Sequence, residues 1–167
     1  LRFFGIGESK LVTELQTLID DQQAVTIAPY AKTNEVTLRL SAQADSKASA
    51  QQALNTVETQ IKAKVGTYFY GYGDDNSLAK VVIKTMIDRQ LSITAAESLT
   101  AGEFQSTIGG VPGVSAIFPG GFVTYANAAK HQLVNVPQAT IDQAGVVSEA
   151  TAIAMADGAR AQLHTDT

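Results

Sequence analysis

The sequence has 167 residues and a formal net charge of −4, with 12 basic, 16 acidic and two histidine residues and no cysteine. The lack of cysteine excludes disulfides, thiol catalysis and thiolate zinc sites, and two isolated histidines do not suffice for an all-histidine metal site. The acidic balance argues against nucleic-acid binding through a basic surface. No apolar run approaches the ~20 residues of a membrane span. The chain starts with Leu rather than Met and shows no signal peptide, so we expect a cytoplasmic piece of a longer polypeptide.

A cluster of turn-forming residues at positions 71–77 divides the chain. Two glycines, two aspartates and an Asn-Ser pair lie there, and such clusters are typical of a boundary. Residues 1–73 hold seven basic and seven acidic residues, whereas residues 74–167 hold five basic and nine acidic ones. We therefore expect two domains, 1–73 and 74–167.

The apolar pattern of residues 1–73 predicts a small α+β domain. Four apolar residues between positions 11 and 19 share one face of a helix, which Ser9 is expected to cap. The remaining expected elements are strands at 25–28 and 35–40 joined by a return over 29–34, a helix over 54–65 that ends at Gly66, and a strand at 68–70.

Residues 74–167 alternate between helical and extended patterns, which predicts an α/β domain with a parallel element. The expected sheet has only two strands, so we expect the domain to be incomplete. The expected elements are helices at 77–89, 97–108 and 127–133, strands at 91–95 and 118–124, and a longer helix that begins at Ser148.

A hydroxyl activated by a lysine is the nucleophile chemistry that remains after the cysteine and histidine options are removed. The stretch from Ile117 to Lys130 holds no other charged residue. Such a lysine suits a general base if it is buried, because burial favours the uncharged amine. A solvated lysine on a short helix explains the same pattern. We interpret His131 and His164 as surface or helix-cap residues.

Two serines are candidates for the hydroxyl. Ser115 follows the glycine-rich break at 109–113, where a tight turn exposes a side chain and surrounds it with N–H groups; a simple turn serine fits equally. Ser98 lies where the expected strand runs into a helix. That position suits a helix cap, or a phosphate bound at the helix N-terminus.

Four segments in order resemble signatures of the CinA family of competence/damage-inducible proteins. They are Thr-Ala-Ala-Glu-Ser-Leu-Thr-Ala-Gly (94–102), Val-Pro-Gly-Val-Ser-Ala (111–116), Gly-Gly-Phe-Val-Thr-Tyr-Ala-Asn-Ala-Ala-Lys (120–130) and Gly-Val-Val-Ser-Glu (145–149). The opening Leu-Arg-Phe-Phe-Gly-Ile-Gly-Glu-Ser also resembles the region that joins the two catalytic domains of the family. The resemblance covers essentially the whole chain.

The resemblance implies a KH-like middle domain followed by the first portion of an α/β amidohydrolase domain. That domain hydrolyses nicotinamide mononucleotide to nicotinic acid mononucleotide and ammonia, without a cofactor or a metal. Carried over by position, Ser115 is the nucleophile and Lys130 its base, and Tyr125 and Ser98 support them by hydrogen bonds. The substrate-binding residues would be Thr100, Gly102 and Gly113.

The resemblance also implies what this chain lacks. The family's molybdopterin-cofactor-like amino-terminal domain is absent, and the carboxy-terminal domain continues past Asp166, so we expect the chain to be inactive alone. Leu99 stands where the signature has cysteine, and Ala101 stands where it has glycine.

The first domain is not expected to bind RNA. KH domains grip nucleic acid through a Gly-x-x-Gly loop, and residues 1–73 have no such loop and no net charge. We expect this domain to be a spacer that helps form a homo-oligomer, most simply a dimer. Two alternatives stay open, a nucleic-acid-binding module and a structural or regulatory fragment.

Overall fold

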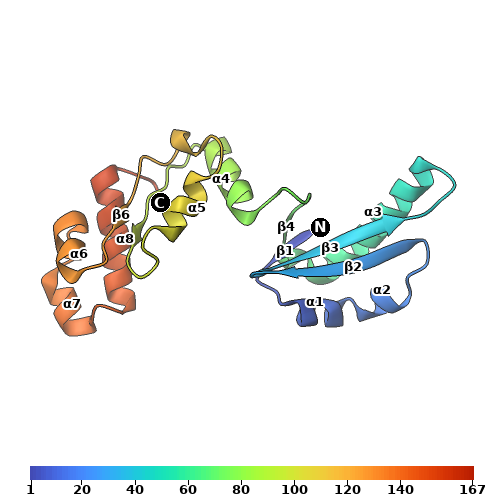
Figure 1. The fold of residues 1–167 in the computed structure, drawn as a ribbon, viewed down its shortest axis with the longest axis horizontal. Coiled ribbons are helices and arrows are strands. Elements are labelled where there is room, and N and C mark those ends of the chain that lie inside the picture. The colour runs from blue at the N-terminus through green and yellow to red at the C-terminus, as the bar shows by residue number, and fades with distance from the viewer. The chain divides into compact units, whose positions relative to one another are not determined.

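The computed structural model describes all 167 residues and divides into two compact units, Leu1–Leu78 and Ala79–Thr167 (Figure 1). The sequence predicted a boundary after residue 73. The division lies slightly later because residues 73 and 74 are bound to the first unit. Both units mix helices and strands, as predicted.

The first unit contains a four-stranded antiparallel sheet in the order β2-β3-β1-β4. Its strands are β1 (Arg2–Phe4), β2 (Val25–Lys32), β3 (Glu35–Ala42) and β4 (Phe69–Gly71). Strand β1 was not predicted, because three residues are too few to show an alternating pattern. The two central strands, β3 and β1, place Val36 opposite Phe3.

The hairpin between β2 and β3 is longer than predicted. Residues 29–32 continue the strand, and Pro29 pairs with Leu38, which is tolerated because β2 is an edge strand with one unpaired side. The predicted return over 29–34 shrinks to residues 33 and 34. Asn34 has a φ of 59°, a left-handed conformation that asparagine adopts more readily than most residues.

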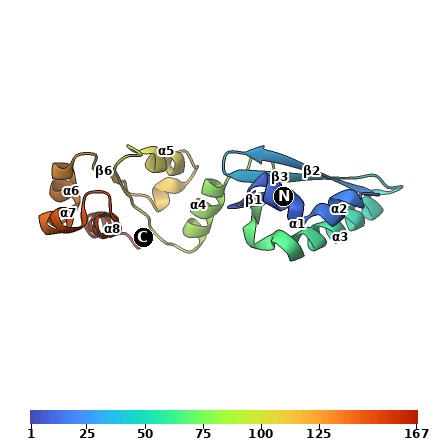
Figure 2. The ribbon, with the colours of Figure 1, turned by 90° about the horizontal axis from the view of Figure 1, so that it is seen from below.

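All three helices of the first unit cover the same face of the sheet (Figure 2). They are α1 (Glu8–Glu14), α2 (Gln16–Asp20) and α3 (Lys47–Val65). The predicted first helix is interrupted at Leu15, and its N-cap is Gly7 rather than Ser9. The helix that ends at Gly66 is confirmed, and a reciprocal Ser46–Ser49 capping box starts it earlier than predicted. The core joins Phe3, Leu11, Leu15, Leu38, Ile61 and Val65, among others.

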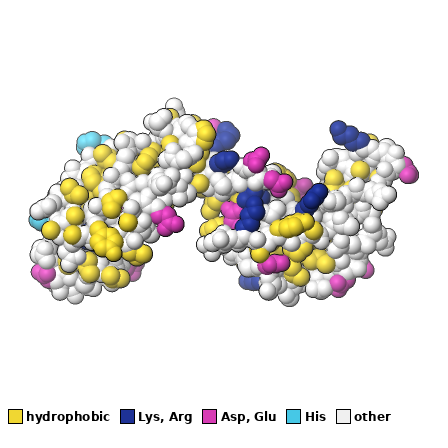
Figure 3. Space-filling model, in the orientation of Figure 1, with side chains coloured by type: hydrophobic (Ala, Val, Ile, Leu, Met, Phe, Trp, Pro, Cys, Tyr) yellow, Lys and Arg dark blue, Asp and Glu magenta, His cyan; other side chains and the backbone are white.

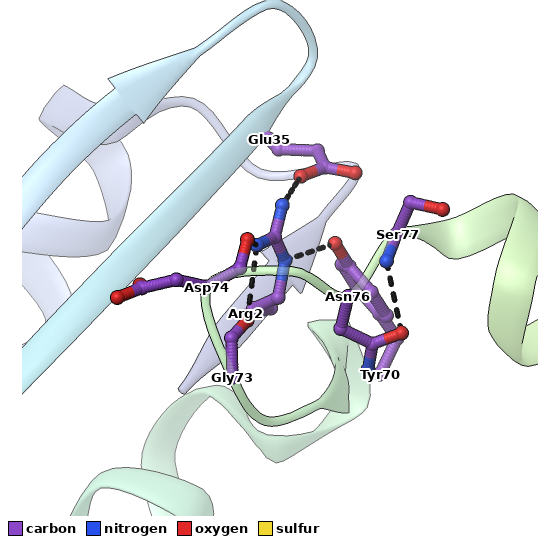
Figure 4. Close-up of polar contacts among 7 residues, drawn as sticks. All are labelled: Arg2, Glu35, Tyr70, Gly73, Asp74, Asn76 and Ser77. Atoms are coloured by element: carbon purple, nitrogen blue, oxygen red, sulfur yellow. Dashed lines mark hydrogen bonds and ion pairs between the residues drawn. The ribbon is translucent and has the colours of Figure 1, made fainter.

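A buried arginine fastens the end of the first unit to its sheet (Figure 4). Arg2 is only 3% exposed. Its guanidinium donates to Glu35 Oε2 at 2.7 Å and to Tyr70 Oη at 2.6 Å. It also donates to the carbonyl oxygens of Gly73 and Asp74, at 3.1 and 2.9 Å. Gly73 and Asp74 belong to the stretch predicted to separate the two domains, and the structure shows them bound to the first unit.

The second unit contains two short parallel strands, β5 (Ala96–Glu97) and β6 (Phe122–Val123). The predicted parallel element is confirmed, although both strands are shorter than expected. Residues 92–94 have an extended partner in the last residues of the chain: Thr167 N donates to Ser92 O, and Thr94 N donates to Thr167 O. This alternation is that of a parallel ladder.

The second unit also contains five α-helices. They are α4 (Leu78–Asp88), α5 (Glu103–Gly109), α6 (Asn127–Val134), α7 (Gln138–Ala144) and α8 (Glu149–Leu163). The helix predicted over 97–108 begins only at Glu103, because residues 98–102 form a turn, and α7 was not predicted. Ser148 caps α8 as predicted. One core cluster joins α6, α7 and α8, and another joins α4 and α5 to residues 114–117.

The inner face of α8 is formed by residues four positions apart. Thr151, Met155 and Ala159 are buried, whereas Ala152 and Ala156 are exposed. Gly158 lets α8 approach α6, since a Cβ atom there would lie 1.8 Å from the carbonyl oxygen of Val134. Glycine is therefore required by close contact between two helices.

Several large apolar side chains are exposed on the second unit, and Figure 3 shows apolar side chains spread over its visible face. The most exposed are Leu99 at 85% and Val147 at 94%. None of the helices combines the length and the hydropathy needed to cross a membrane.

Candidate active site

Lys130 is the most deeply buried charged side chain of the second unit, at 2% exposure. Its Nζ donates to the carbonyl oxygens of Thr124 and Tyr125 at 2.8 and 3.1 Å, and to Ser98 Oγ at 3.1 Å. No carboxylate forms an ion pair with it. Burial of a charged amine without a counter-ion is costly, so the arrangement needs an explanation beyond stability.

The position of Lys130 follows from helix periodicity. It lies on α6 four residues before Val134, and both face the interior. Three residues, 124–126, connect the end of β6 to the start of α6. The amine consequently lies beside the carbonyl groups of Thr124 and Tyr125, the two residues that follow β6.

Ser98 reaches the same place from the neighbouring strand. Glu97 pairs with Val123 in the parallel register, so Ser98 and Thr124 are the next residues of the two strands. The carboxyl ends of parallel strands meet at one edge of a sheet, where α/β proteins commonly bind ligands. Ser98 is half-buried.

A carboxylate holds the turn that follows Ser98. Glu97 Oε2 accepts from the backbone N–H groups of Gly102 and Phe104, each at 3.1 Å, and Oε1 accepts from that of Gln105 at 2.9 Å. Burial raises the pKa of Glu97, but donation from Gln105, the Thr100 hydroxyl and Phe104 outweighs it and lowers the pKa to about 2. Glu97 is therefore ionised at neutral pH.

The turn itself requires left-handed backbone. Ala101 has a φ of 49° and Gly102 a φ of 103°. Glycine adopts such values freely, whereas alanine is strained there. The conformation directs the N–H groups of the first turn of α5 back toward Glu97.

These contacts overturn the predicted role of Ser98 as a helix cap. Gly102 is the N-cap of α5, and the N–H groups at the start of that helix are occupied by Glu97. They are not free for a phosphate. The hydroxyl of Ser98 instead accepts a hydrogen bond from Lys130.

The structure does not bring Ser115 into this hydrogen-bonded group. Ser115 is exposed on a short 3-10 helix (Val114–Ala116), and its hydroxyl makes no hydrogen bond. Gly113 is the N-cap of that helix and has a φ of 86°. This left-handed conformation favours glycine and accounts for the residue without a role in binding. The sequence paired Lys130 with Ser115, whereas in the structure its hydroxyl partner is Ser98.

Tyr125 contributes its backbone rather than its phenol. The side chain is 68% exposed and forms no hydrogen bond, while the carbonyl oxygen accepts from Lys130. Thr100 and Gly102 lie in the turn beside Glu97. Their predicted contacts with a substrate, and that of Gly113, stay predictions.

Glu97 and Thr124 were not predicted as residues of the site. Glu97 is the only charged residue between Arg89 and Glu103, the same signal of isolation that singled out Lys130. His131 is exposed and its Nδ1 lies 2.9 Å from the carbonyl oxygen of Val136. No group of three or more histidine, aspartate or glutamate side chains is placed to hold a metal ion.

Comparison with known families decides the affiliation of the chain. Residues 75–167 match the family described as CinA C-terminal domain, and residues 1–71 match the damage-inducible protein CinA KH domain. The chain belongs to the CinA family. This confirms the resemblance that the sequence motifs indicated.

Curated CinA relatives are longer than this chain. A competence-damage inducible protein of Lactiplantibacillus plantarum is 74% identical over 166 residues, which cover 99% of this chain and 40% of the relative. A protein of the same description from Streptococcus pneumoniae is 49% identical, with 99% and 41% covered. The chain thus spans about 40% of the length of these relatives.

Solved CinA structures resemble part of the chain. A CinA superfamily protein from Escherichia coli aligns with a TM-score of 0.53 and 29% identity, over 57% of this chain and 58% of that one. A competence/damage inducible protein from Agrobacterium tumefaciens aligns with a TM-score of 0.51 and 36% identity, over 55% of each chain.

Proposed function

We propose that the second unit is part of an amide hydrolase that acts on nicotinamide mononucleotide, with Ser98 as nucleophile and Lys130 as general base. The observation that carries this proposal is the 3.1 Å contact between Ser98 Oγ and the buried Lys130 Nζ. The contact lies at the carboxyl ends of parallel strands. The substrate is inferred from the resemblance to the CinA family.

The hydrogen bonds around Lys130 suit a base. In its uncharged form the amine has two N–H protons and one lone pair, and the carbonyl oxygens of Thr124 and Tyr125 accept those two protons. The lone pair then faces the hydroxyl of Ser98. The amine can take up the Ser98 proton while both carbonyl contacts persist.

The reaction follows in two balanced stages. Ser98 Oγ attacks the carboxamide carbon while its proton moves to Lys130. Lys130 returns that proton to the departing nitrogen, so ammonia leaves and an ester on Ser98 remains. Water then attacks the ester with Lys130 again accepting a proton, which releases nicotinic acid mononucleotide and restores the Ser98 hydroxyl.

Ser98 and Ser115 can be separated experimentally. Alanine is introduced at each of the aligned positions of the longer Lactiplantibacillus relative, and release of ammonia from nicotinamide mononucleotide is measured. We expect Ser98→Ala to reduce turnover by at least about 10²-fold, since the covalent route is lost. Ser115→Ala should retain turnover within about 3-fold.

Ser106→Ala serves as the matched control, because Ser106 is exposed on α5 and its hydroxyl makes no hydrogen bond. Loss of turnover in Ser115→Ala together with near-normal turnover in Ser98→Ala would assign the nucleophile to Ser115. Two further expectations stay predictions. They are that the chain forms a homo-oligomer and that its small-molecule partner is a nucleotide.

A further inference from the structure

We infer that Glu97 is a positioning residue that sets the distance between Ser98 and Lys130; this inference rests on the proposed function. Glu97 is 6% exposed and directly precedes Ser98. Its carboxylate makes no hydrogen bond or ion pair with Lys130. It therefore acts through its neighbours rather than on the reacting atoms.

The side chain of Glu97 closes the turn that carries Ser98. The turn leaves β5 at Glu97 and ends where α5 begins, at Gly102. The carboxylate binds N–H groups at that far end, on Gly102, Phe104 and Gln105. One residue thus holds both ends of the turn, and Ser98 cannot move without breaking charge-assisted hydrogen bonds.

The backbone of Glu97 holds the other half of the site. Its carbonyl oxygen accepts from Thr124 N at 2.7 Å and from Thr124 Oγ1 at 3.3 Å. Thr124 is completely buried, and its own carbonyl oxygen binds Lys130 Nζ at 2.8 Å. A continuous chain of contacts therefore runs from Ser98 through Glu97 and Thr124 to Lys130.

Glutamine at position 97 separates charge from size. It keeps the length of the side chain but replaces one acceptor oxygen with an amide NH₂, which then faces backbone N–H groups that also donate. At least one of the present hydrogen bonds is lost. The turn loosens and the Ser98 hydroxyl drifts from the amine, and displacement of about 1 Å can cost about 10²-fold in rate.

The test compares Glu97→Gln with Glu103→Gln, which removes an exposed carboxylate from the first turn of α5. Ser98→Ala and Lys130→Met serve as reference variants. One readout is covalent labelling of Ser98 in this chain by a fluorophosphonate probe, followed by mass spectrometry. The other is kcat and KM for nicotinamide mononucleotide, measured at the aligned positions of the longer Lactiplantibacillus relative.

We expect Glu97→Gln to lower kcat and the labelling rate by about 10- to 100-fold, with KM changed less than about 3-fold. The shape of the pH profile of kcat should not change, because Glu97 exchanges no proton in the reaction. Glu103→Gln should match the unsubstituted protein in every readout.

A second variant covers the case in which Glu97→Gln does not fold. Thr124→Val keeps the bond from the residue 124 N–H to the Glu97 carbonyl and the bond from Lys130 Nζ to the residue 124 carbonyl. It removes only the 3.3 Å hydrogen bond from Thr124 Oγ1 to the Glu97 carbonyl. A several-fold fall in kcat at constant KM supports the inference, and an unchanged kcat in a folded Thr124→Val or Glu97→Gln protein overturns it. If Ser98→Ala keeps normal turnover and Lys130→Met keeps normal turnover and normal labelling of Ser98, the proposed function itself fails.

Discussion

The two units each bury one basic side chain almost completely, and the two are compensated in different ways. Arg2 in the first unit is 3% exposed and Lys130 in the second is 2% exposed. Arg2 is paired with the carboxylate of Glu35 at 2.7 Å. Lys130 has only two carbonyl groups and one hydroxyl around its amine.

The difference follows the chemistry of the two groups. A guanidinium keeps its charge in proteins and offers donors in several directions, so Arg2 can join a strand, a phenol and the chain that leaves β4. Arg2 also influences the ionisation of Glu35. Burial raises the pKa of Glu35, but the hydrogen bonds with Arg2 and Tyr70 and the positive charges of Arg2 and Lys32 together outweigh burial and lower the pKa. A compensated charge of this kind has a structural role.

Lys130 is surrounded by neutral groups instead. Its amine donates to the carbonyl oxygens of Thr124 and Tyr125 and to the hydroxyl of Ser98, and none of these acceptors carries a charge. The partners of the two buried basic groups therefore differ. Arg2 has a carboxylate partner and holds the sheet and the chain after β4 together, whereas Lys130 has neutral acceptors and the adjacent hydroxyl on which the proposed chemistry rests.

The largest expected effect is the loss of turnover in Lys130→Met. Methionine fills the apolar part of the site but cannot accept the Ser98 proton, so we expect kcat to fall by about 10²- to 10⁴-fold. The second unit should lose about 1 to 3 kcal/mol of stability, because the carbonyl oxygens of Thr124 and Tyr125 lose their donor although no ion pair is broken. Ammonia release in the longer relative and hydrogen exchange in this chain measure the two quantities.

Lys84→Met is the control for that substitution, since Lys84 is exposed and pairs only with Asp88 on the surface of α4. A Lys130→Met protein that keeps its turnover, or that unfolds while Lys84→Met does not, would place Lys130 in the structural class with Arg2.

The next largest effect is on the stability of the first unit. Arg2→Met leaves Glu35 without its partner and frees the carbonyl groups of Gly73 and Asp74, so we expect a loss of about 3 kcal/mol. Hydrogen exchange of the amides of β1 and β3 in the full chain reports this loss. Arg39→Met, at an exposed arginine on β3, should stay within about 0.5 kcal/mol of the unsubstituted chain. Equal protection in both variants would show that Arg2 is dispensable.

The smallest effect concerns strain beside the candidate site. Ala101 holds a φ of 49°, which glycine adopts without a Cβ penalty, so Ala101→Gly should stabilise the second unit by up to about 1 kcal/mol. The matched change Ala152→Gly, at an exposed position in the interior of α8, should instead destabilise it by about 1 kcal/mol. Thermal unfolding of both variants distinguishes the two signs, and destabilisation by Ala101→Gly would contradict the strain at this turn.

Sequence patterns predicted the long elements better than the short ones. The helix that ends at Gly66 and the helix capped by Ser148 were predicted because periodicity and capping residues agree. Strand β1 was missed, and residues 98–102 were taken as helix, because the turn there depends on a buried carboxylate. The carboxylate of Glu97 accepts the hydrogen bonds that hold this turn, so that α5 begins only at Glu103. No local sequence pattern predicts these bonds.

The amino-acid sequence was sufficient to predict the family, the α+β and α/β character of the two parts, and the isolation of Lys130 among uncharged residues. Those features depend on local composition and spacing. Which hydroxyl Lys130 contacts depends instead on how the chain folds. Ser98 and Lys130 are far apart along the chain, and the parallel register of β5 and β6 brings Ser98 beside Thr124, whose carbonyl oxygen binds the amine. Partners across a parallel sheet are set by register, which is a property of the folded chain.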